Sequence, residues 1–478
     1  MQVIILGGSI GSLQRESTMK SSNGFLALSF ALVLGCMIGA QATVIADDWP
    51  QLQGNSQHSG DASHVLLPTS LGLVAAIPLT DAVLAAPVVS DGKAFVVDAS
   101  GVVYAINTQT LQVVWRFATQ GGAANCNNVA APAVIGKYVH VGTMAGNYYV
   151  LDRDSGAVVK EIDCAEPVFS APVVGEDRVY FATLGARVYA VEPDGDLVWT
   201  WDFVKEIVGF QGDRWKGEEW LAFRGDRVTW RDHFVCSRDI CLVGKTVVMP
   251  AGGRTVFLDD AGDSPQLRAV GEIPAYAGDE FPATFGQSAD AAGNVYVQWH
   301  RRDNAGRVEI LRLAGDNVET TFLPGTETSI DLHGLLSFAS VSIRGSDVYR
   351  VRPEHGVGLC RHSPGQKEPE VLCAAGSICP PVLTRDHAVY GGLDGKLYIV
   401  PLRKGETTSF ATAFGAPITA PVAVAEGRIY VPCEDGYLYI LSPDGTAPLP
   451  EKDLEVEDPQ PAHWTSGGRE VRLVHELR

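Results

Sequence analysis

The short acidic segments of this chain are the first places to look for chemistry. Asp152–Gly156 reads DRDSG, which resembles the first half of a calcium-binding loop. Such a loop needs a glutamate at its twelfth position, and Asp163 stands there instead. Asp, Ser and Gly also form turns by bonding their own backbone, so the sequence predicts a hairpin turn and no metal site. The pairs Asp394-Gly395 and Asp435-Gly436 are predicted to be turns for the same reason.

Histidine and cysteine show no metal-ligand spacing. The 11 histidines are scattered, without an H-x-x-x-H pair, and the nine cysteines include no C-x-x-C. Short spacings of this kind are typical of the ligands of tetrahedral metal sites in proteins. The sequence therefore predicts no metal ligands and names no catalytic residue.

The charge balance bears on the kind of partner. The chain has 37 basic and 56 acidic residues, for a net charge of -19. An acidic surface repels phosphate backbones, so no nucleic-acid binding is expected.

The N-terminus carries the pattern of an export signal. An apolar run over residues 25–39 is followed by the A-x-A site Ala40-Gln41-Ala42. The run is short for a transmembrane helix, so no transmembrane span is expected. We expect residues 1–46 to be a signal region with Met19 as the true start, and the protein to be periplasmic or secreted. Cys36 is the candidate for a lipid anchor, with a loose match to a bacterial lipoprotein box.

The rest of the chain repeats one pattern of short strands. Each copy opens on an apolar run, often after Ala-Pro, and continues through glycine turns to a third run containing Tyr. Four short strands in about 40 residues is the pattern of a propeller blade, so the fold class is an all-β propeller of four-stranded blades. The count is eight, with seven as the alternative if the weakest copy is a loop. The copies lie at residues 86–117, 131–162, 171–201, 241–260, 290–316, 337–365, 379–401 and 420–442.

The ends of the repeat region predict how the ring closes. Residues 47–60 are polar and without a period, which suggests an arm or cap. Residues 70–79 form an apolar run that could supply the outer strand of the last blade, at 420–441. The propeller is therefore assigned to residues 47–445, and residues 446–478 to a C-terminal tail.

Aromatic residues recur at fixed places in the repeat. A periodic apolar residue is most often core, so we expect these side chains to dock one blade on the next. They are Tyr104, Trp115, Tyr149, Tyr189, Trp199, Tyr398 and Tyr439.

One long segment, residues 202–235, breaks the repeat between the third and fourth blades; we call it the rim insertion. It mixes tryptophan and arginine, which is the composition of interface hot spots, and it is the candidate partner-binding segment. The alternative is that its tryptophans pack back on the blade rim. The candidate residues are Trp215, Trp220, Trp230, Arg214, Arg224 and Arg231.

Cys126 and Cys164 form the one positional pair among the cysteines. Each lies a few residues before the Ala-Pro that opens a blade, at Pro132 and Pro172. Equivalent loops of adjacent blades are neighbours in a propeller, so a disulfide there would join two blades. Two local pairs, Cys236 with Cys241 and Cys360 with Cys373, have weaker geometric support.

The repeat resembles that of the pyrroloquinoline-quinone-like propellers. The resemblance is carried by GVVYAINTQTLQVVW at residues 101–115 and GNYYVLDRDSGAVVK at residues 146–160, although Leu111 and Lys160 replace the usual Gly and Trp. It covers roughly residues 47–445, and it is specific for the fold and poor for the function. That family includes quinone-dependent alcohol and sugar dehydrogenases, and also non-catalytic scaffolds such as the lipoprotein of the outer-membrane barrel-assembly machinery.

The resemblance implies two classes of function. A quinone dehydrogenase of this family implies pyrroloquinoline quinone in the channel, a Ca²⁺ ion and a carboxylate base, with a vicinal Cys-Cys pair over the quinone in its alcohol-oxidising members. The chain has no adjacent cysteines. We therefore expect a non-catalytic protein-binding or assembly scaffold. The alternatives are a dehydrogenase with degenerate signatures and a carbohydrate-binding propeller that uses the rim insertion.

Overall fold

The computed structural model describes most of the chain between residues 48 and 451. The described residues are 48–67, 70–121, 125, 128–224, 233–272, 283–300, 305–329, 339–353, 356–451, 463–466 and 469–472. No helix in this part of the chain is long and apolar enough to cross a membrane. The predicted signal region, the start at Met19 and the lipid anchor at Cys36 lie outside the described residues.

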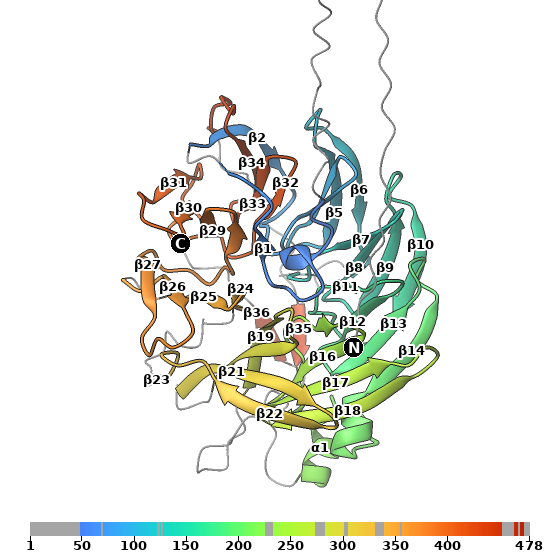
Figure 1. Cartoon of the computed structure of the whole chain (residues 1–478). Helices are drawn as coiled ribbons and strands as arrows, with labels where there is room; N and C mark the ends of the chain where they lie inside the picture. The colour runs from blue at the N-terminus through green and yellow to red at the C-terminus, as the bar shows by residue number, and fades with distance from the viewer. Residues whose placement is uncertain are drawn as a thin grey trace, which may run out of the picture. The chain divides into compact units, whose positions relative to one another are not determined.

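Eight blades of four strands each stand in a ring, which confirms the eight-bladed propeller (Figure 1). In the seventh blade a short additional strand from the N-terminal side of the chain, β1 (Asp61–Ala62), pairs parallel with the inner strand. Each blade begins with its inner strand, next to the axis, and proceeds outward through antiparallel neighbours. The first four blades are β3–β6 (Val88–Ser90, Lys93–Val97, Val102–Asn107, Val113–Ala118), β7–β10 (Ala133–Ile135, Tyr138–Gly142, Asn147–Asp152, Val158–Asp163), β11–β14 (Val173–Val174, Val179–Ala182, Arg187–Val191, Leu197–Asp202) and β15–β18 (Cys241–Val243, Thr246–Ala251, Arg254–Asp260, Pro265–Glu272).

The second half of the ring repeats the arrangement with less regular sequence. Its blades are β19–β22 (Ala283–Ala289, Asn294–His300, Ala305–Ala314, Asn317–Phe322), β24–β27 (Ser342–Arg344, Asp347–Val351, Leu359–His362, Glu370–Cys373), β28–β31 (Val382–Thr384, His387–Gly391, Lys396–Pro401, Thr408–Ala411) and β32–β34 (Ala423–Ala425, Arg428–Pro432, Tyr437–Ser442) with β2 (Gly72–Pro78). The short strand β23 (Thr328–Ser329) adds to β21, and β35 (His463–Ser466) pairs with β36 (Arg469–Arg472).

The ring closes as the sequence predicts. β2, from the N-terminal side of the chain, pairs antiparallel with β34 and completes the eighth blade from outside, with Ala76 opposite Tyr439. Closure of this kind leaves no blade at the end of a row with an uncovered face. The two ends of the repeat region are thereby joined in one sheet.

The core lies between neighbouring blades. Because successive side chains of a strand point to opposite faces, each blade contributes to two clusters. In β9, Tyr149 packs toward the first blade with Phe95 and Val141, whereas Tyr148 packs toward the third blade with Phe181. The Tyr148 and Phe181 rings are stacked with centroids 3.6 Å apart.

The residues at the Trp position of the outer strands reach across to the next blade. The Trp115 indole N–H donates to the Arg153 carbonyl at 3.0 Å, and the Trp199 indole N–H donates to Asp260 Oδ1 at 3.2 Å. Lys160, which stands in the same place in the second blade, pairs instead with Asp196 at 2.7 Å. Tyr104, Tyr149, Tyr189 and Tyr439 are buried, and Tyr398 is half-buried.

Most outer strands carry a β-bulge at the same level. The pairing shifts by one residue in β6, β10, β14, β18, β27 and β2. A bulge twists an edge strand and interrupts its row of free backbone groups. Valines next to these shifts are exposed on β6 and β10, where Val114 and Val158 are both 46% exposed.

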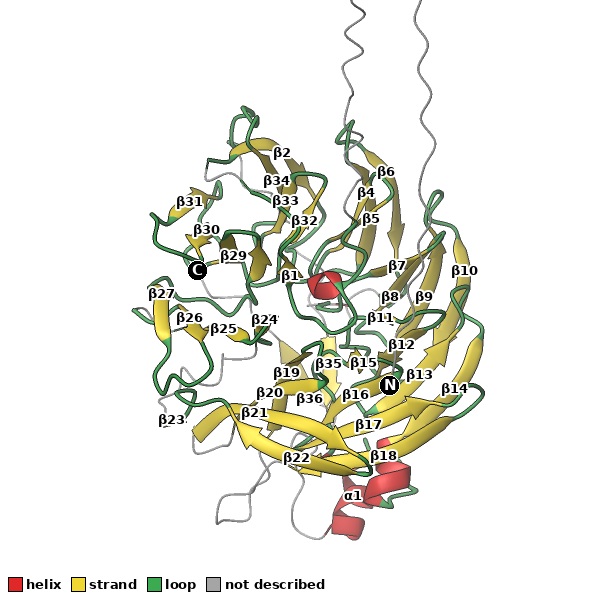
Figure 2. Ribbon diagram, viewed as in Figure 1, coloured by secondary structure: helices red, strands yellow, loops and turns green. Residues whose placement is uncertain are grey.

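Residues 48–67, which we call the channel arm, run along the axis past the inner strands (Figures 1 and 2). Seven inner strands each donate one backbone N–H to the arm, in chain order. Six of the acceptors are arm carbonyls and one is the Gln51 side-chain oxygen. The donor–acceptor pairs, all at 2.8–2.9 Å, are Val89–Trp49, Val134–Pro50, Val174–Gln51, Leu242–Ser56, Ala289–Gln57, Ile343–Ser59 and Leu383–Gly60.

The arm carries a buried histidine whose titration predicts a pH effect. Burial lowers the pKa of His58 from 6.5 to about 3. As the pH falls below 6.5, His58 takes up a proton in the unfolded chain but stays neutral in the folded chain. The His58 contribution to the free energy of unfolding is therefore present above pH 6.5 and is lost as the pH falls toward 3. We expect His58→Asn to reduce the slope of unfolding free energy against pH by up to about 1.4 kcal/mol per pH unit in this window.

Urea unfolding at several pH values between 4 and 7 measures that slope. Asn is chosen because His58 has φ 54, a region that Asn tolerates. The preceding arm residue Gln57 has no titratable group, so the control Gln57→Asn should leave the slope unchanged. An unchanged slope in His58→Asn would show that the ring is solvated or protonated in the folded protein.

Candidate functional site

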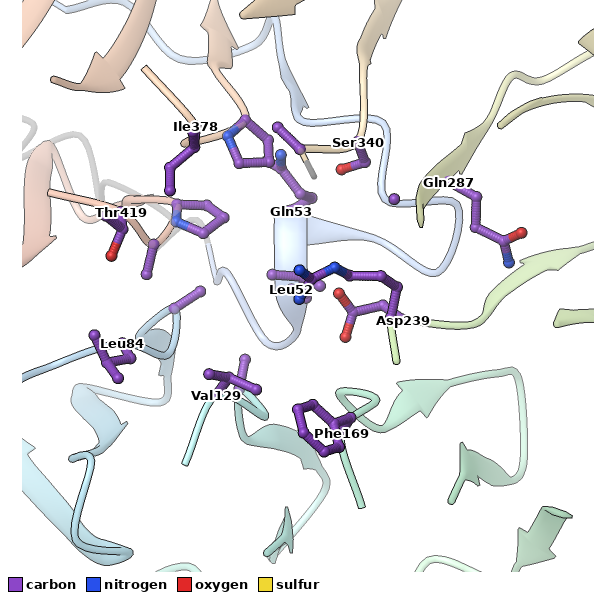
Figure 3. Close-up of a pocket in the computed structure, with 18 of the residues that line it drawn as sticks. Leu52, Gln53, Leu84, Val129, Phe169, Asp239, Gln287, Ser340, Ile378 and Thr419 are labelled. Atoms are coloured by element: carbon purple, nitrogen blue, oxygen red, sulfur yellow. The ribbon is translucent and has the colours of Figure 1, made fainter. Parts of the chain in front are cut away.

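A cavity of about 240 Å³ lies on the axis of the ring and is lined by residues of all eight blades (Figure 3). Most of its wall is built from the residues just before the inner strands, where the chain arrives from the preceding outer strand; in the fifth blade, Gly286 and Gln287 lie within the inner strand β19. It therefore opens on the face of the ring that carries these blade-to-blade connections. Its floor is Leu52 and Gln53 of the channel arm.

The floor is held by a tight turn. η1 (Leu52–Gly54) is a single 3₁₀ turn in which Gln53 has φ 56 and Gly54 has φ 79. A Cβ on Gly54 would lie 2.7 Å from the Trp49 ring, so only glycine allows the turn to close against that indole. Leu52 packs on Ala86, Ala131 and Ala171 of the first three blades.

One position of the wall distinguishes the fourth blade from the others. It lies three residues before the inner-strand residue that bonds the arm, and in seven blades it holds a small or cyclic side chain. The fourth blade has Asp239 there, with Arg238 immediately before it. The other seven are Ala86, Ala131, Ala171, Gly286, Ser340, Pro380 and Pro421.

Asp239 and Arg238 bring the charge of the pocket. Asp239 Oδ1 accepts the Ala171 backbone N–H at 2.7 Å, and Figure 3 shows the carboxylate directed toward Leu52 at the axis. Burial raises the pKa of Asp239, and the Ala171 N–H and Arg238 oppose that shift. Burial lowers the pKa of Arg238, and Asp239 opposes it. Each charge thus stabilises the other in a partly desolvated wall.

The apolar part of the wall lies on the other blades. Leu84, Val129, Phe169 and Ile378 come from the connections into the first, second, third and seventh blades. Figure 3 shows them around the axis on the sides away from Gln287 and Ser340. Gln287 turns its amide outward, where Nε2 donates to the Val248 carbonyl at 2.6 Å.

The rim insertion ends at Val235, three residues before this charged pair. It leaves β14 through η3 (Val204–Val208) and α1 (Gly217–Arg224), and returns to the inner strand β15 through Arg238 and Asp239. The Cys236 N–H donates to the Leu184 carbonyl at 3.0 Å, which fixes the returning chain on the third blade. The insertion is therefore part of the face on which the pocket opens.

The candidate partner-binding residues of the insertion are largely occupied within the protein. Trp220 is 0% exposed and packs on Phe210 and Phe234. Trp215 is half-buried, and its indole N–H donates to Glu166 Oε1 at 3.3 Å. These two tryptophans follow the alternative interpretation, in which they pack back on the rim. Trp230 and Arg231 lie outside the described residues.

Arg214 ties the insertion to the third blade. Its guanidinium bonds the Gly185 carbonyl and Asp202, and lies 3.6 Å from Glu166 Oε1. Arg187 of β13 joins the same two carboxylates, at 3.3 Å from Asp202 and 3.8 Å from Glu166. A closed set of two arginines and two carboxylates satisfies its own charges, and a partner would have to break it to use Arg214.

Among the described residues of the insertion, the exposed large apolar side chains are on α1. Leu221 is 39% exposed and Phe223 is 42% exposed. Arg224 ends this helix. Assignment of the insertion to a partner surface remains a prediction, and α1 is the part of it that offers apolar side chains to solvent.

Of the three predicted cysteine pairs, one includes a residue outside the described part of the chain and the other two are not disulfides. Cys126 lies outside the described residues, so its pairing with the buried Cys164 stays a prediction. The two local pairs are not bonded: Cys236, Cys241, Cys360 and Cys373 are all thiols. Burial raises the pKa of Cys236 and of Cys241 to about 12, which keeps these thiols protonated and inert.

The DRDSG segment is a turn, as predicted. Asp152 Oδ1 accepts the backbone N–H groups of Asp154 and Ser155 and the Ser155 hydroxyl, and Gly156 has φ 72. Within the described part of the chain, no three His, Cys, Asp or Glu side chains stand where they could hold a metal ion.

The pocket residues do not fit pyrroloquinoline quinone with a divalent cation. Ca²⁺ takes six to eight oxygen ligands, and Asp239 is the single carboxylate of the described lining. The quinone is a tricarboxylate, and Arg238 is the single cation there to meet it. The volume also lies below the roughly 300–1,000 Å³ of ordinary small-molecule sites. No reaction step through that group follows from this site.

Comparison with known proteins finds similarity to these propellers. A family model described as outer membrane protein assembly factor BamB matches residues 73–168 and 130–264. The resemblance to the pyrroloquinoline-quinone-like propellers is confirmed. No curated protein sequence matches the chain.

Solved structures of two kinds share the propeller. A quinohemoprotein alcohol dehydrogenase from Comamonas testosteroni is 16% identical with a TM-score of 0.59, covering 85% of this chain and 82% of its own. BamB from Moraxella catarrhalis is 14% identical with a TM-score of 0.54, covering 78% and 100%. A europium-containing methanol dehydrogenase is 13% identical with a TM-score of 0.58, covering 80% and 89%. Identities this low show the fold alone, and the names span both functional classes.

An alignment of the repeat copies could have singled out Arg238 and Asp239, although the sequence analysis did not. Aligned on the Ala-Pro that opens the first three blades, the fourth copy has Asp239-Ile240 in place of Ala-Pro, and Arg238 in place of the preceding residue. A charged pair at a position otherwise filled by small residues marks a break in the ring. The pair lies between the rim insertion, which ends at residue 235, and the fourth copy of the repeat, which begins at residue 241.

Proposed function

We propose that this chain is an exported propeller that acts as a non-catalytic protein-binding or assembly module. The observation that carries the proposal is the axial pocket, which has its own arm as a floor and a single carboxylate and a single arginine in its described lining. These groups do not make up a quinone and metal site. A rigid ring of hairpins with long connections on one face is suited to holding a partner instead.

Loading with cofactor tests the proposal against the dehydrogenase. The purified chain is incubated with pyrroloquinoline quinone and Ca²⁺ and then desalted. We expect no protein-bound quinone absorbance and no dye-linked oxidation of ethanol or glucose. A bound quinone chromophore together with alcohol- or sugar-dependent dye reduction would overturn the proposal.

Site-specific photo-cross-linking in the producing cells tests the binding role directly. A cross-linker at Phe223 on α1 is expected to give a discrete protein adduct. Val371, which is similarly exposed at 46% on the bulged outer strand β27, is the matched control and should give none. Equal labelling from both positions, or no adduct from Phe223, would count against a partner at the insertion.

The carbohydrate-binding alternative gains no support from the described tryptophans of the insertion, although Phe223 on α1 is exposed. Stacking on a sugar needs an exposed aromatic face. Trp220 is buried and Trp215 is half-buried against Phe234 and Glu166.

A further inference from the structure

The outer strand of the fifth blade, β22, has a regular free edge. Six other outer strands are shifted by one residue at a β-bulge, whereas the register of β22 on β21 runs without a shift from Asn317 to Phe322. The outer strand β31 is also unshifted, but it has four residues against the six of β22. A bulge interrupts the row of backbone groups that an edge strand presents. Among the described outer strands, β22 therefore has the longest uninterrupted edge.

The hairpin that leads into β22 accounts for this regular register. β21 and β22 are joined by two residues, Gly315 and Asp316, and Gly315 has φ 64. Two-residue turns with glycine at the first position match the twist of the strands that they join. In the first blade, by contrast, the corresponding connection takes residues 108–112 and is followed by a bulge.

Alternate residues of β22 turn their backbone groups to the free edge. Asn317 closes the two-residue hairpin and so bonds β21, and bonded residues alternate along an antiparallel pair. The Leu323 N–H continues the alternation by donating to a β21 carbonyl at 2.9 Å. Val318, Thr320 and Phe322 therefore direct their N–H and C=O groups away from β21. Within the described part of the chain, β21 is the one strand that pairs with β22.

The same three residues place their side chains on one face of the blade, toward the fourth blade. Val318 is half-buried in the cluster between the fourth and fifth blades. Phe322 is 39% exposed, and the Arg307 guanidinium lies 4.4 Å from its ring centroid. Figures 1 and 2 show β22 on the outside of the ring, beside β18. An incoming strand can therefore lay apolar side chains against Val318 and Phe322.

The charge along this edge is negative. Residues 315–327 contain three carboxylates and no lysine or arginine. All three carboxylate side chains are exposed, and they belong to Asp316, Glu319 and Glu327. Arg312 of β21 lies opposite Glu319 on the side away from the free edge. A basic side chain on the incoming strand would meet Glu319 from the other side, which is a favourable cross-strand pair.

We propose that β22 binds an extended segment of a partner protein as a fifth strand of this blade, in which basic residues alternate with apolar ones. The segment bonds the backbone of Val318, Thr320 and Phe322, its apolar side chains lie on the face of Val318 and Phe322, and its basic side chains lie on the face of Glu319. Strand addition takes its affinity from main-chain hydrogen bonds and its specificity from alternate side chains. This inference rests on the proposed partner-binding function and adds to it the edge and the kind of segment that the edge takes.

Fluorescence anisotropy with labelled synthetic peptides tests the strand addition. The probe is a capped heptapeptide in which lysine and valine alternate. One control peptide has glutamate in place of each lysine, and a second has every backbone nitrogen methylated. We expect the probe to bind at least ten-fold more tightly than either control, because the first control loses the charge match and the second loses the main-chain donors. No binding of the probe at millimolar concentration, or equal binding by the methylated peptide, would overturn the proposal.

Proline substitution locates the edge. Thr320→Pro removes an N–H that faces the free edge and keeps the bonds to β21, so it should abolish binding of the probe with little change in stability. Ser409→Pro is the matched control, because Ser409 is exposed on the unshifted strand β31 and lies between residues that bond β30, as the Thr412 N–H does at the Gly395 carbonyl. Ser409→Pro should leave the affinity unchanged.

Charge reversal keeps the test decisive if Thr320→Pro folds poorly. Glu319→Lys should weaken binding of the lysine peptide at least ten-fold and strengthen binding of the glutamate peptide. Unchanged affinity in both β22 variants would overturn the assignment. A cross-link from Phe223 without peptide binding at β22 would overturn the strand addition alone, whereas loading with pyrroloquinoline quinone would overturn the proposed function.

Discussion

Deletion of residues 48–67 is expected to lower the free energy of unfolding by roughly 4–10 kcal/mol, at about 0.5–1.5 kcal/mol for each of seven lost hydrogen bonds. Each bond joins an inner strand of a different blade to the channel arm. The deletion also removes Trp49, which is 3% exposed. Losses of this size approach the whole stability of a typical domain. Urea unfolding followed by tryptophan fluorescence measures the change.

The eighth inner strand provides an internal control for the role of the arm. Among the described residues, no arm carbonyl accepts the amide of Val424, the residue of β32 that corresponds to the seven donors. In the milder variant Trp49→Ala, hydrogen exchange should accelerate at Val89 and Val134 and stay unchanged at Val424. Uniform acceleration at all three amides would mean that the ring loosens as a whole and that the arm has no local effect.

Trp220→Ala is expected to cost about 3–5 kcal/mol, the usual range for removing a fully buried large aromatic side chain. Trp220 is 0% exposed and touches Phe210, Phe223 and Phe234. These side chains belong to the same core cluster as β14 and β16, so the cavity opens between the insertion and the ring. Thermal and urea unfolding measure the loss.

Leu221 is the matched control for Trp220. It is the next residue of α1 and is 39% exposed, so Leu221→Ala should change stability by less than about 0.5 kcal/mol. Limited proteolysis gives a second measurement, because a loosened insertion is expected to be cut in Trp220→Ala before the blades are. A Trp220→Ala protein as stable and protease-resistant as Leu221→Ala would show that the insertion does not share the core of the ring.

The propeller could be predicted from the repeat because each strand and turn of a blade is specified by residues that are close together in the sequence. A turn glycine after an acidic residue and a following Tyr in the third strand specify a hairpin without reference to distant parts of the chain. The closing role of β2 also followed, since a ring of blades needs an outer strand for the last of them. What local signals cannot show is contact between a polar segment and seven separate strands, so they do not predict the course of the channel arm.

The candidate site was harder to predict for a related reason. Arg238 and Asp239 are ordinary charged residues in the sequence, and they become distinctive only when the eight inner-strand entries are superposed around the axis. In the insertion, Trp220 and Arg214 are of the residue types that are enriched in interface hot spots, but both side chains are buried like core residues. Composition alone does not separate those two, because tryptophan and arginine are common in both settings.

The order of contacts along the channel arm has a consequence for how the chain assembles. Trp49, Pro50, Gln51, Ser56, Gln57, Ser59 and Gly60 meet the first to the seventh blades in the order in which those blades are synthesised. The arm is therefore synthesised before any blade, and the hydrogen-bond acceptor for each of the first seven blades is already present when that blade is synthesised. The eighth blade is completed by the outer strand β2, which the whole length of the ring separates in sequence from its partner β34. Late events in folding should concern that last seam, and a chain stalled before residue 437 would hold seven blades in register around an open gap.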